Sequence, residues 1–199
     1  MVQTDTVRAV GRPREFDEAT VLEAAMDAFW RKGFEATSLV DLTAATGLNK
    51  ASLYRVFGDK HSLFLAALRN YAESEMREVR KVIDETASPL VNIHAIVNKV
   101  IDDFAHEKGC MMINSLVELG PHDTEVAQLL RSFSEQRVTA LIGMLGQAQA
   151  AGEVRAELNP AKLARSLMIT LAGSAAMAKG FMPREAIAEN VEILIDSWC

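Results

Sequence analysis

Apolar residues recur every three to four positions along most of this chain, the spacing of one face of an α-helix. Ala, Leu, Glu, Met and Arg dominate the sequence, while the β-branched and aromatic residues form no alternating runs bounded by hairpin signals. Only five prolines and eleven glycines interrupt the pattern. The sequence therefore predicts an all-α protein of about nine helices.

Two short helices are predicted between residues 38 and 57 (SLVDLTAATGLNKASLYRVF). Ser38 and Asp41 have the spacing of a helix start, because the hydroxyl can accept from a free amide and the carboxylate faces the positive helix end. Gly47 can end the first helix in the left-handed conformation, and Asn49 can cap the second. On spacing alone, the pair is either a helix-turn-helix or an ordinary helical hairpin.

A supporting helix is predicted before this pair. Asp17 can cap it and Gly33 can end it, with Phe34 folding back toward Phe29. Residues 1–15 are polar and lack an apolar period, so they are expected to form a flexible arm.

The rest of the chain predicts a larger helical body. A long helix capped by Asp59 should run from about 60 to 86, and its charged second half is expected to be a solvated face. We place the boundary between the small unit and the body at residues 60 and 61. Five further helices are predicted to start at Ser88–Pro89, near Cys110, at Asp123 or Thr124, at Asn159–Pro160 and after Pro183; the first of them should end near Lys108–Gly109.

The net charge of −6 does not favour nucleic acid, so the placement of the charges matters. Residues 1–60 carry eight Lys and Arg against nine Asp and Glu, while residues 61–199 carry thirteen against eighteen. Binding to DNA would depend on two local basic clusters, formed by Arg8, Arg12 and Arg14 and by Lys50, Arg55 and Lys60.

Several classes of protein are disfavoured. No apolar run is long enough to span a bilayer and no export signal is present, so a cytoplasmic protein is expected. Cys110 and Cys199 lack metal-ligand spacing, which predicts neither a metal site nor a cofactor. No nucleophile and base stand at a telling spacing, so we predict no enzyme, although an α-helical enzyme or small-molecule carrier remains the alternative.

Two segments closely resemble the amino-terminal DNA-binding domain of TetR-type transcriptional repressors: GRPREFD at 11–17 and KGFEATSLVDLTAATGLNKASLYRVFGDKHSLF at 32–64. This resemblance decides between the two interpretations of the short helices in favour of a helix-turn-helix. It implies a homodimeric repressor that binds a near-palindromic double-stranded operator and releases it when a small-molecule effector enters the body.

The resemblance also assigns roles to individual positions. Val56 and Thr43 depart from the usual family residues, which puts one phosphate contact and the packing of the short helices in doubt. The implied base-facing residues are Lys50 and Ala51, the implied phosphate-facing residues are Ser52, Tyr54 and Lys60, and further contacts with the DNA backbone are assigned to Thr37 and Ser38. In the arm, Arg14 would approach the minor groove or the DNA backbone, the alternative being a solvated charged tail.

The last two helices resemble the four-helix dimerisation element of the family. In the final helix, Ile187, Val191, Leu194 and Trp198 recur at helical spacing. The same stripe is also compatible with the core of a monomer.

The effector site is less defined by the sequence. Candidate residues are His94, Cys110, Asn114, Met144 and Met177, although methionines at helical spacing are more often core residues. Cys110 has two interpretations: a thiol with a lowered pKa, owing to a helix start and Lys108, or a buried inert side chain. Cys199 is expected to be exposed.

Overall fold

A computed structural model describes residues 17–105 and 108–199 and confirms the all-α prediction, since these residues form nine α-helices and no strand. No helix in this part of the chain is both long and apolar enough to cross a membrane. The helices are α1 (Glu18–Lys32), α2 (Leu39–Thr46), α3 (Lys50–Phe57), α4 (Lys60–Lys81), α5 (Pro89–Phe104), α6 (Met111–Leu119), α7 (Thr124–Ala150), α8 (Pro160–Gly180) and α9 (Arg184–Asp196).

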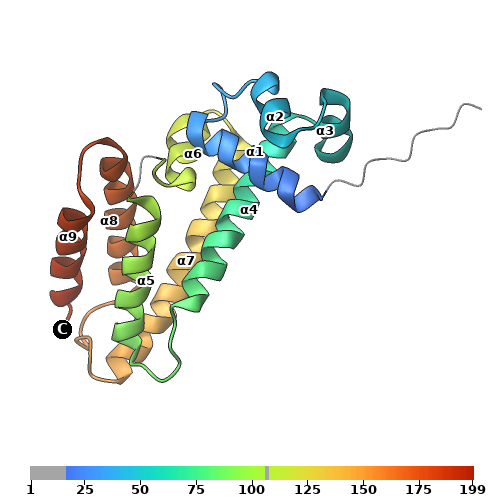
Figure 1. The fold of residues 1–199 in the computed structure, drawn as a ribbon. Coiled ribbons are helices and arrows are strands. Elements are labelled where there is room, and N and C mark those ends of the chain that lie inside the picture. The colour runs from blue at the N-terminus through green and yellow to red at the C-terminus, as the bar shows by residue number, and fades with distance from the viewer. Residues whose placement is uncertain (1–16, 106–107) are drawn as a thin grey trace, which may run out of the picture.

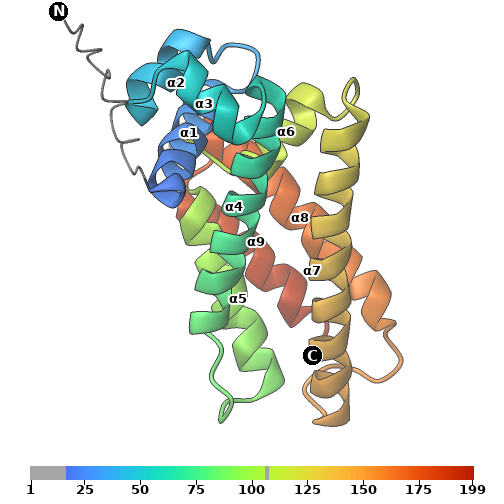
Figure 2. The same cartoon turned by 90° about the vertical axis from the view of Figure 1, so that its right-hand side faces the viewer.

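The helices form a small head and a long body (Figure 1). Helices α1, α2 and α3 lie together at one end of the molecule, and the carboxyl terminus lies toward the other. Helix α4 starts in the head and runs down the body, where α5, α7, α8 and α9 pack on one another (Figure 2). Helix α6 contacts α4, α7 and α8 close to the head.

The helix ends of the head follow local sequence signals. The Ser38 hydroxyl accepts from the Asp41 amide and the Asp41 carboxylate accepts from the Ser38 amide, which forms the capping box at the start of α2. Gly47 ends α2 with a φ of 68°, and the Asn49 side chain accepts from the Ser52 amide at 2.9 Å to cap α3. These contacts confirm the predicted pair of short helices.

An aromatic cluster joins α1 to α4. The Phe29 and Phe34 rings stack at 6.2 Å across the Gly33 turn, as predicted. Phe64 of α4 meets Phe29 edge to face at 5.1 Å and Phe34 at 5.0 Å. The first half of α4 therefore packs into the same aromatic cluster as α1 and the turn that follows it.

Helix α4 ends at Lys81, five residues earlier than predicted. The Asn92 side chain accepts from the Asp84 amide and donates to the Asp84 carbonyl, both at 2.9 Å. The Asp84 carboxylate in turn accepts from the amide and hydroxyl of Thr86 at 2.8 and 2.7 Å. These side chains satisfy the backbone of the connecting turn and compete with further helical hydrogen bonds.

The apolar face of α9 is used within the chain. Ile187, Val191, Ile195 and Trp198 are all at most 2% exposed. Leu194, which we placed in the same stripe, is only partly buried at its edge. The predicted stripe therefore packs into the body's own core, and any contact between subunits needs other side chains.

Candidate functional site

The outer face of α3 carries the predicted DNA-binding residues. Leu53 is fully buried and fixes the orientation of the helix. Lys50 and Ala51 are exposed, while Ser52 and Tyr54 are partly exposed. The Lys50 ammonium lies 5.7 Å from the centroid of the Tyr54 ring. The face thus presents a cation, a hydroxyl and an aromatic ring to solvent, which suits phosphates and base edges.

Thr37 and Ser38 differ in what they can offer. Thr37 is fully buried, and its hydroxyl donates to the Gly33 carbonyl at 2.5 Å. The Thr37 side chain therefore closes the turn before α2, so the predicted contact with the DNA backbone would have to come from the main chain of Thr37. The exposed Ser38 keeps its place at the helix start, with its hydroxyl 2.7 Å from the Asp41 carboxylate.

The negative charge of Asp41 is compensated locally. Hydrogen bonds from Lys32 and then from Ser38 hold the pKa of Asp41 far below its usual value. The Lys32 ammonium lies 2.5 Å from the Asp41 carboxylate, so the pair adds no net charge to the head beside α3.

Lys60 begins α4 next to the helix-turn-helix. Its ammonium lies 4.4 Å from the centroid of the Phe34 ring, and this cation–π contact directs the Lys60 side chain toward the turn between α1 and α2. The remaining predicted contact, Arg14, lies in the arm outside the described residues.

The body contains a partly open cavity of about 170 Å³ lined by residues of α4, α5, α6, α7 and α8. Most of its lining is apolar. Three charged residues also reach it, and these are Glu75, Asp103 and Arg137.

The cavity includes two of the five predicted effector residues. Cys110 and Met144 line it, whereas His94, Asn114 and Met177 do not. The Asn114 amide donates to the Lys108 carbonyl at 2.9 Å, and Met177 is 42% exposed on α8.

The charged part of the lining was not predicted from the sequence. The second half of α4, predicted to be a solvated face, contributes Glu75, Met76 and Val79 to the cavity. The sequence does contain a signal: Glu75 lies four residues after Tyr71 and four before Val79, so it shares the helix face of these two apolar residues.

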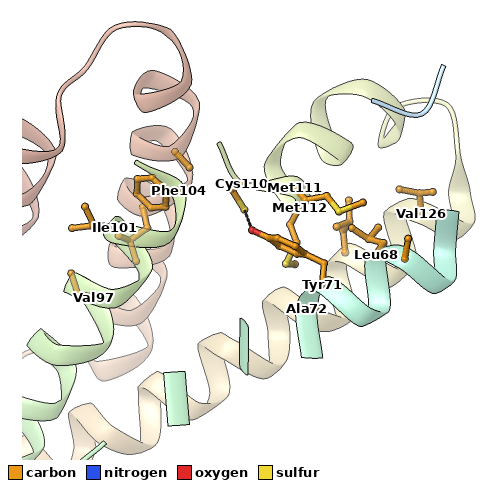
Figure 3. Packing of buried hydrophobic residues seen from close by; sticks show 14 of the residues in the cluster. Leu68, Tyr71, Ala72, Val97, Ile101, Phe104, Cys110, Met111, Met112 and Val126 are labelled. Atoms are coloured by element: carbon orange, nitrogen blue, oxygen red, sulfur yellow. Dashed lines mark hydrogen bonds between the residues drawn. The ribbon is translucent and has the colours of Figure 1, made fainter. Parts of the chain in front are cut away.

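Cys110 lies at the start of α6, as predicted, but its thiol is not activated. Tyr71 donates its hydroxyl to Cys110 Sγ at 3.8 Å (Figure 3). Burial raises the pKa of the Cys110 thiol, and the Glu75 carboxylate raises it further. Burial likewise raises the pKa of Tyr71. Of the two interpretations, the buried side chain is therefore supported and the lowered pKa is wrong, because burial outweighs the helix start; Cys199 is exposed as expected.

Helix α6 connects the cavity to the head. Its first turns contribute Cys110 and Ile113 to the lining. Near its other end, Glu118 accepts hydrogen bonds from the backbone amides of Phe34 at 3.0 Å and Glu35 at 2.8 Å. A movement of α6 would therefore act directly on the turn between α1 and α2.

Two further contacts join the head side of the molecule to the body. The Trp30 indole of α1 donates to the Gly109 carbonyl at 2.9 Å. His61 in the first turn of α4 lies 2.7 Å from the carboxylate of Asp123, which caps α7. The head is thus attached to the body through α1, α4 and the turn that follows α1.

Comparisons with known proteins agree with this arrangement. Residues 21–67 match the family model described as bacterial regulatory proteins, tetR family, and residues 89–194 match the tetracyclin repressor-like C-terminal domain. The HTH-type transcriptional repressor ComR of Escherichia coli (strain K12) is 33% identical over 203 residues, covering 98% of this chain and 97% of ComR. The uncharacterized HTH-type regulator YezE of Bacillus subtilis (strain 168) is 32% identical over 188 residues, covering 92% of this chain and 97% of YezE.

Solved structures share the fold over nearly the whole chain. A cysteine mutant of the TetR family regulator CifR, complexed with a 26-bp double-strand operator, superposes with a TM-score of 0.83 and 29% identity. The match covers 95% of this chain and 100% of that one. The helix-turn-helix head on a helical body defines a DNA-binding regulator, and the chain belongs to the TetR family of transcriptional regulators.

Proposed function

We propose that this protein is a homodimeric transcriptional repressor that binds a near-palindromic operator through α3 and releases it when a small molecule occupies the body cavity. The exposed face of α3, which combines Lys50, Ala51, Ser52 and Tyr54, carries the proposal. The repressor named ComR and the operator complex of CifR support the same function.

The size of α3 fits the proposed role. An α-helix with its side chains is about 10–12 Å across and fits the DNA major groove, which is roughly 12 Å wide; the eight residues of α3 place about 12 Å of helix there. One helix of this length reaches few base pairs, so two heads related by a twofold axis are needed for specific binding. The proposed operator symmetry follows from this requirement.

Exposed apolar side chains on α8 and on α9 support the proposed dimer. Ile169 and Ile193 are 73% and 70% exposed, and Met177 is 42% exposed. Gly173 lies midway between Ile169 and Met177 at intervals of four residues, so the three share one face of α8. Large exposed apolar side chains that share one face of a helix are typical of a protein contact surface.

Substitutions around α3 test the proposed DNA contact. Tyr54→Phe and Lys60→Ala should weaken binding to all DNA sequences alike, because they remove proposed phosphate contacts, and Lys60→Ala should reduce the salt slope by about 1. Lys50→Ala should instead change the preferred operator sequence. Fluorescence anisotropy with operator and random duplexes at two salt concentrations measures these effects.

Lys81→Ala serves as the matched control, because Lys81 is an exposed lysine at the other end of α4. It should leave affinity, sequence preference and salt slope unchanged. If all three head variants kept the affinity, sequence preference and salt slope of the wild type, α3 and the start of α4 would not be part of the DNA interface.

The link from cavity to head gives a second prediction. Glu118→Ala should speed hydrogen exchange at the Phe34 and Glu35 amides by at least about tenfold, since a hydrogen bond to a charged acceptor contributes roughly 1.5 kcal/mol or more. Glu118→Gln keeps one acceptor oxygen and should protect one amide better than Glu118→Ala does. Amide exchange followed by NMR measures both variants.

Two results would count against this link. Unchanged exchange at both amides in Glu118→Ala would show that the hydrogen bonds do not hold the turn after α1. Faster exchange throughout α1, at residues remote from the turn, would instead indicate general destabilisation of the head.

A further inference from the structure

The cavity lining is almost entirely apolar. Apart from Glu75, Asp103 and Arg137, every lining residue is aliphatic, aromatic or sulfur-containing. Side chains from α5, α7 and α8 supply most of this surface, including Val97, Phe104, Leu141 and Leu171. A ligand in contact with this lining gains affinity chiefly by burying its own apolar surface.

The charged residues of the lining already have partners. Arg137 Nη2 lies 2.6 Å from Glu75 Oε2, with both side chains at most 24% exposed. Asp103 pairs with Lys99 one helical turn earlier on α5. In residues 17–105 and 108–199, no buried side-chain nitrogen or oxygen atom lacks a hydrogen-bond partner. A charged ligand would therefore have to displace one member of a pair and leave that member or itself incompletely compensated.

The volume indicates the size of a ligand that fits inside the cavity. A cavity of about 150 Å³ lined by aliphatic and aromatic side chains stays dry and binds benzene. The cavity of about 170 Å³ found here is only slightly larger. It suits one ring with a short substituent, or an aliphatic molecule of similar size.

From these observations we infer that the effector of this repressor is a small, uncharged and mostly apolar molecule, about the size of one substituted ring. The inference rests on the proposed function, because it names the ligand class of the same cavity. The Glu75–Arg137 ion pair, which links α4 to α7, determines which ligands the cavity accepts. As long as the two side chains remain paired, neither is available to compensate the charge of an anionic or a cationic ligand.

Four probes built on one carbon frame test the inference directly. Ethylbenzene and 2-phenylethanol are uncharged, whereas phenylacetate is an anion and 2-phenylethylamine a cation at neutral pH. Titration calorimetry without DNA should show the two uncharged probes binding at least tenfold more tightly than either ion. Tighter binding of either ion than of ethylbenzene, or no binding of ethylbenzene, would overturn the inference.

Variants of the ion pair should reverse the selectivity. Arg137→Met leaves the Glu75 carboxylate without its partner, so 2-phenylethylamine should gain at least tenfold in affinity. Glu75→Gln leaves Arg137 without its carboxylate, so phenylacetate should gain by a similar factor. Both variants should keep their affinity for ethylbenzene within about threefold, since apolar burial supplies its binding. Unchanged affinity for both ions in both variants would contradict the role of the pair.

A filled cavity provides the control for location. Ala175 lines the cavity and is 3% exposed, so Ala175→Leu should reduce ethylbenzene binding at least tenfold. Ala156→Leu makes the same change at an exposed site outside the lining and should have no effect. If Ala175→Leu does not fold, Met144→Ala enlarges the cavity instead and should admit 1-ethylnaphthalene, which wild type should reject.

The proposed repressor function and the inferred ligand class can be refuted independently of each other. Operator binding is measured without any probe, and probe binding is measured without DNA. A wild-type protein that binds no operator would refute the proposed repressor function. If that protein still bound ethylbenzene more tightly than either ion, the inferred ligand class of the cavity would stand. A protein that binds its operator but prefers an ion in the cavity would refute only the inference about the effector.

Discussion

Gly173→Arg should convert the proposed dimer into a monomer and weaken operator binding by at least about a hundredfold, because each monomer keeps one of two recognition helices. Gly173 is exposed on α8, and a Cβ atom built there meets no other atom within 4 Å. A single chain therefore has room for the arginine side chain. Only a partner subunit packed against this face would meet a long charged side chain, with its steric and desolvation costs.

Sedimentation velocity at micromolar concentration and operator titration should be run together on this variant. Gly146→Arg is the matched control, because Gly146 is an exposed glycine of α7 with equally open surroundings. It should stay dimeric and bind the operator normally. A dimeric Gly173→Arg variant, or a monomeric wild type, would refute the proposed α8–α9 contact.

The fold was largely predictable because helix starts depend on local chemistry. Asp17, Ser38, Asn49, Asp59 and Asn159 each accept from an amide two or three residues later in the chain. A side chain this close to its acceptor or donor in sequence needs no tertiary information to act as a cap. The predicted order and starts of the helices therefore hold throughout the described residues.

The end of α4 was less predictable, because it depends on a side chain from the next helix. The charged stretch after Tyr71 has good helical propensity, and the short-range contact of Asp84 with Thr86 is only a weak local signal against the helix before residue 86. The turn is stabilised by Asn92 of α5, whose amide binds the backbone of Asp84. A sequence pattern does not reveal that pairing.

The candidate site also depends on contacts between residues that are far apart in the sequence. Glu75 and Arg137 are 62 residues apart and meet only because α4 and α7 pack together. Cys110 has the local features of an activated thiol, yet its surroundings in three dimensions bury it and raise its pKa. For α3, by contrast, the resemblance to a known DNA-binding unit identified an outward face that the structure also exposes.

The stripe on α9 illustrates a third case, in which one pattern served two hypotheses. Apolar residues at helical spacing predict a buried face, but not whether that face packs within the chain or on another subunit. The structure buries Ile187 and Val191 in the body and leaves Ile193 exposed on a different side of the helix. The proposed dimer contact therefore depends on exposed side chains, and the predicted apolar stripe of α9 does not include them.

Phe64→Ala should lower the free energy of unfolding by about 3–5 kcal/mol, the range measured for large aromatic residues removed from a core. Phe64 is 1% exposed and its ring meets both Phe29 and Phe34. Its side chain therefore holds α1, the turn that follows α1 and α4 in one cluster. Because this loss is comparable to the whole stability of many domains, operator binding at 37 °C should be lost as well.

Chemical denaturation followed by circular dichroism measures the loss of stability. Phe64→Leu keeps most of the buried apolar volume and should cost clearly less than Phe64→Ala, which separates packing from aromatic contacts. A fragment ending at residue 60 lacks Phe64 altogether and should be unfolded, whereas one extended through Ala72 should regain helical signal. We propose on this basis that the head extends past the boundary placed at residues 60 and 61. A folded 1–60 fragment, or a cost below about 1 kcal/mol for Phe64→Ala, would show that the head is stable without α4.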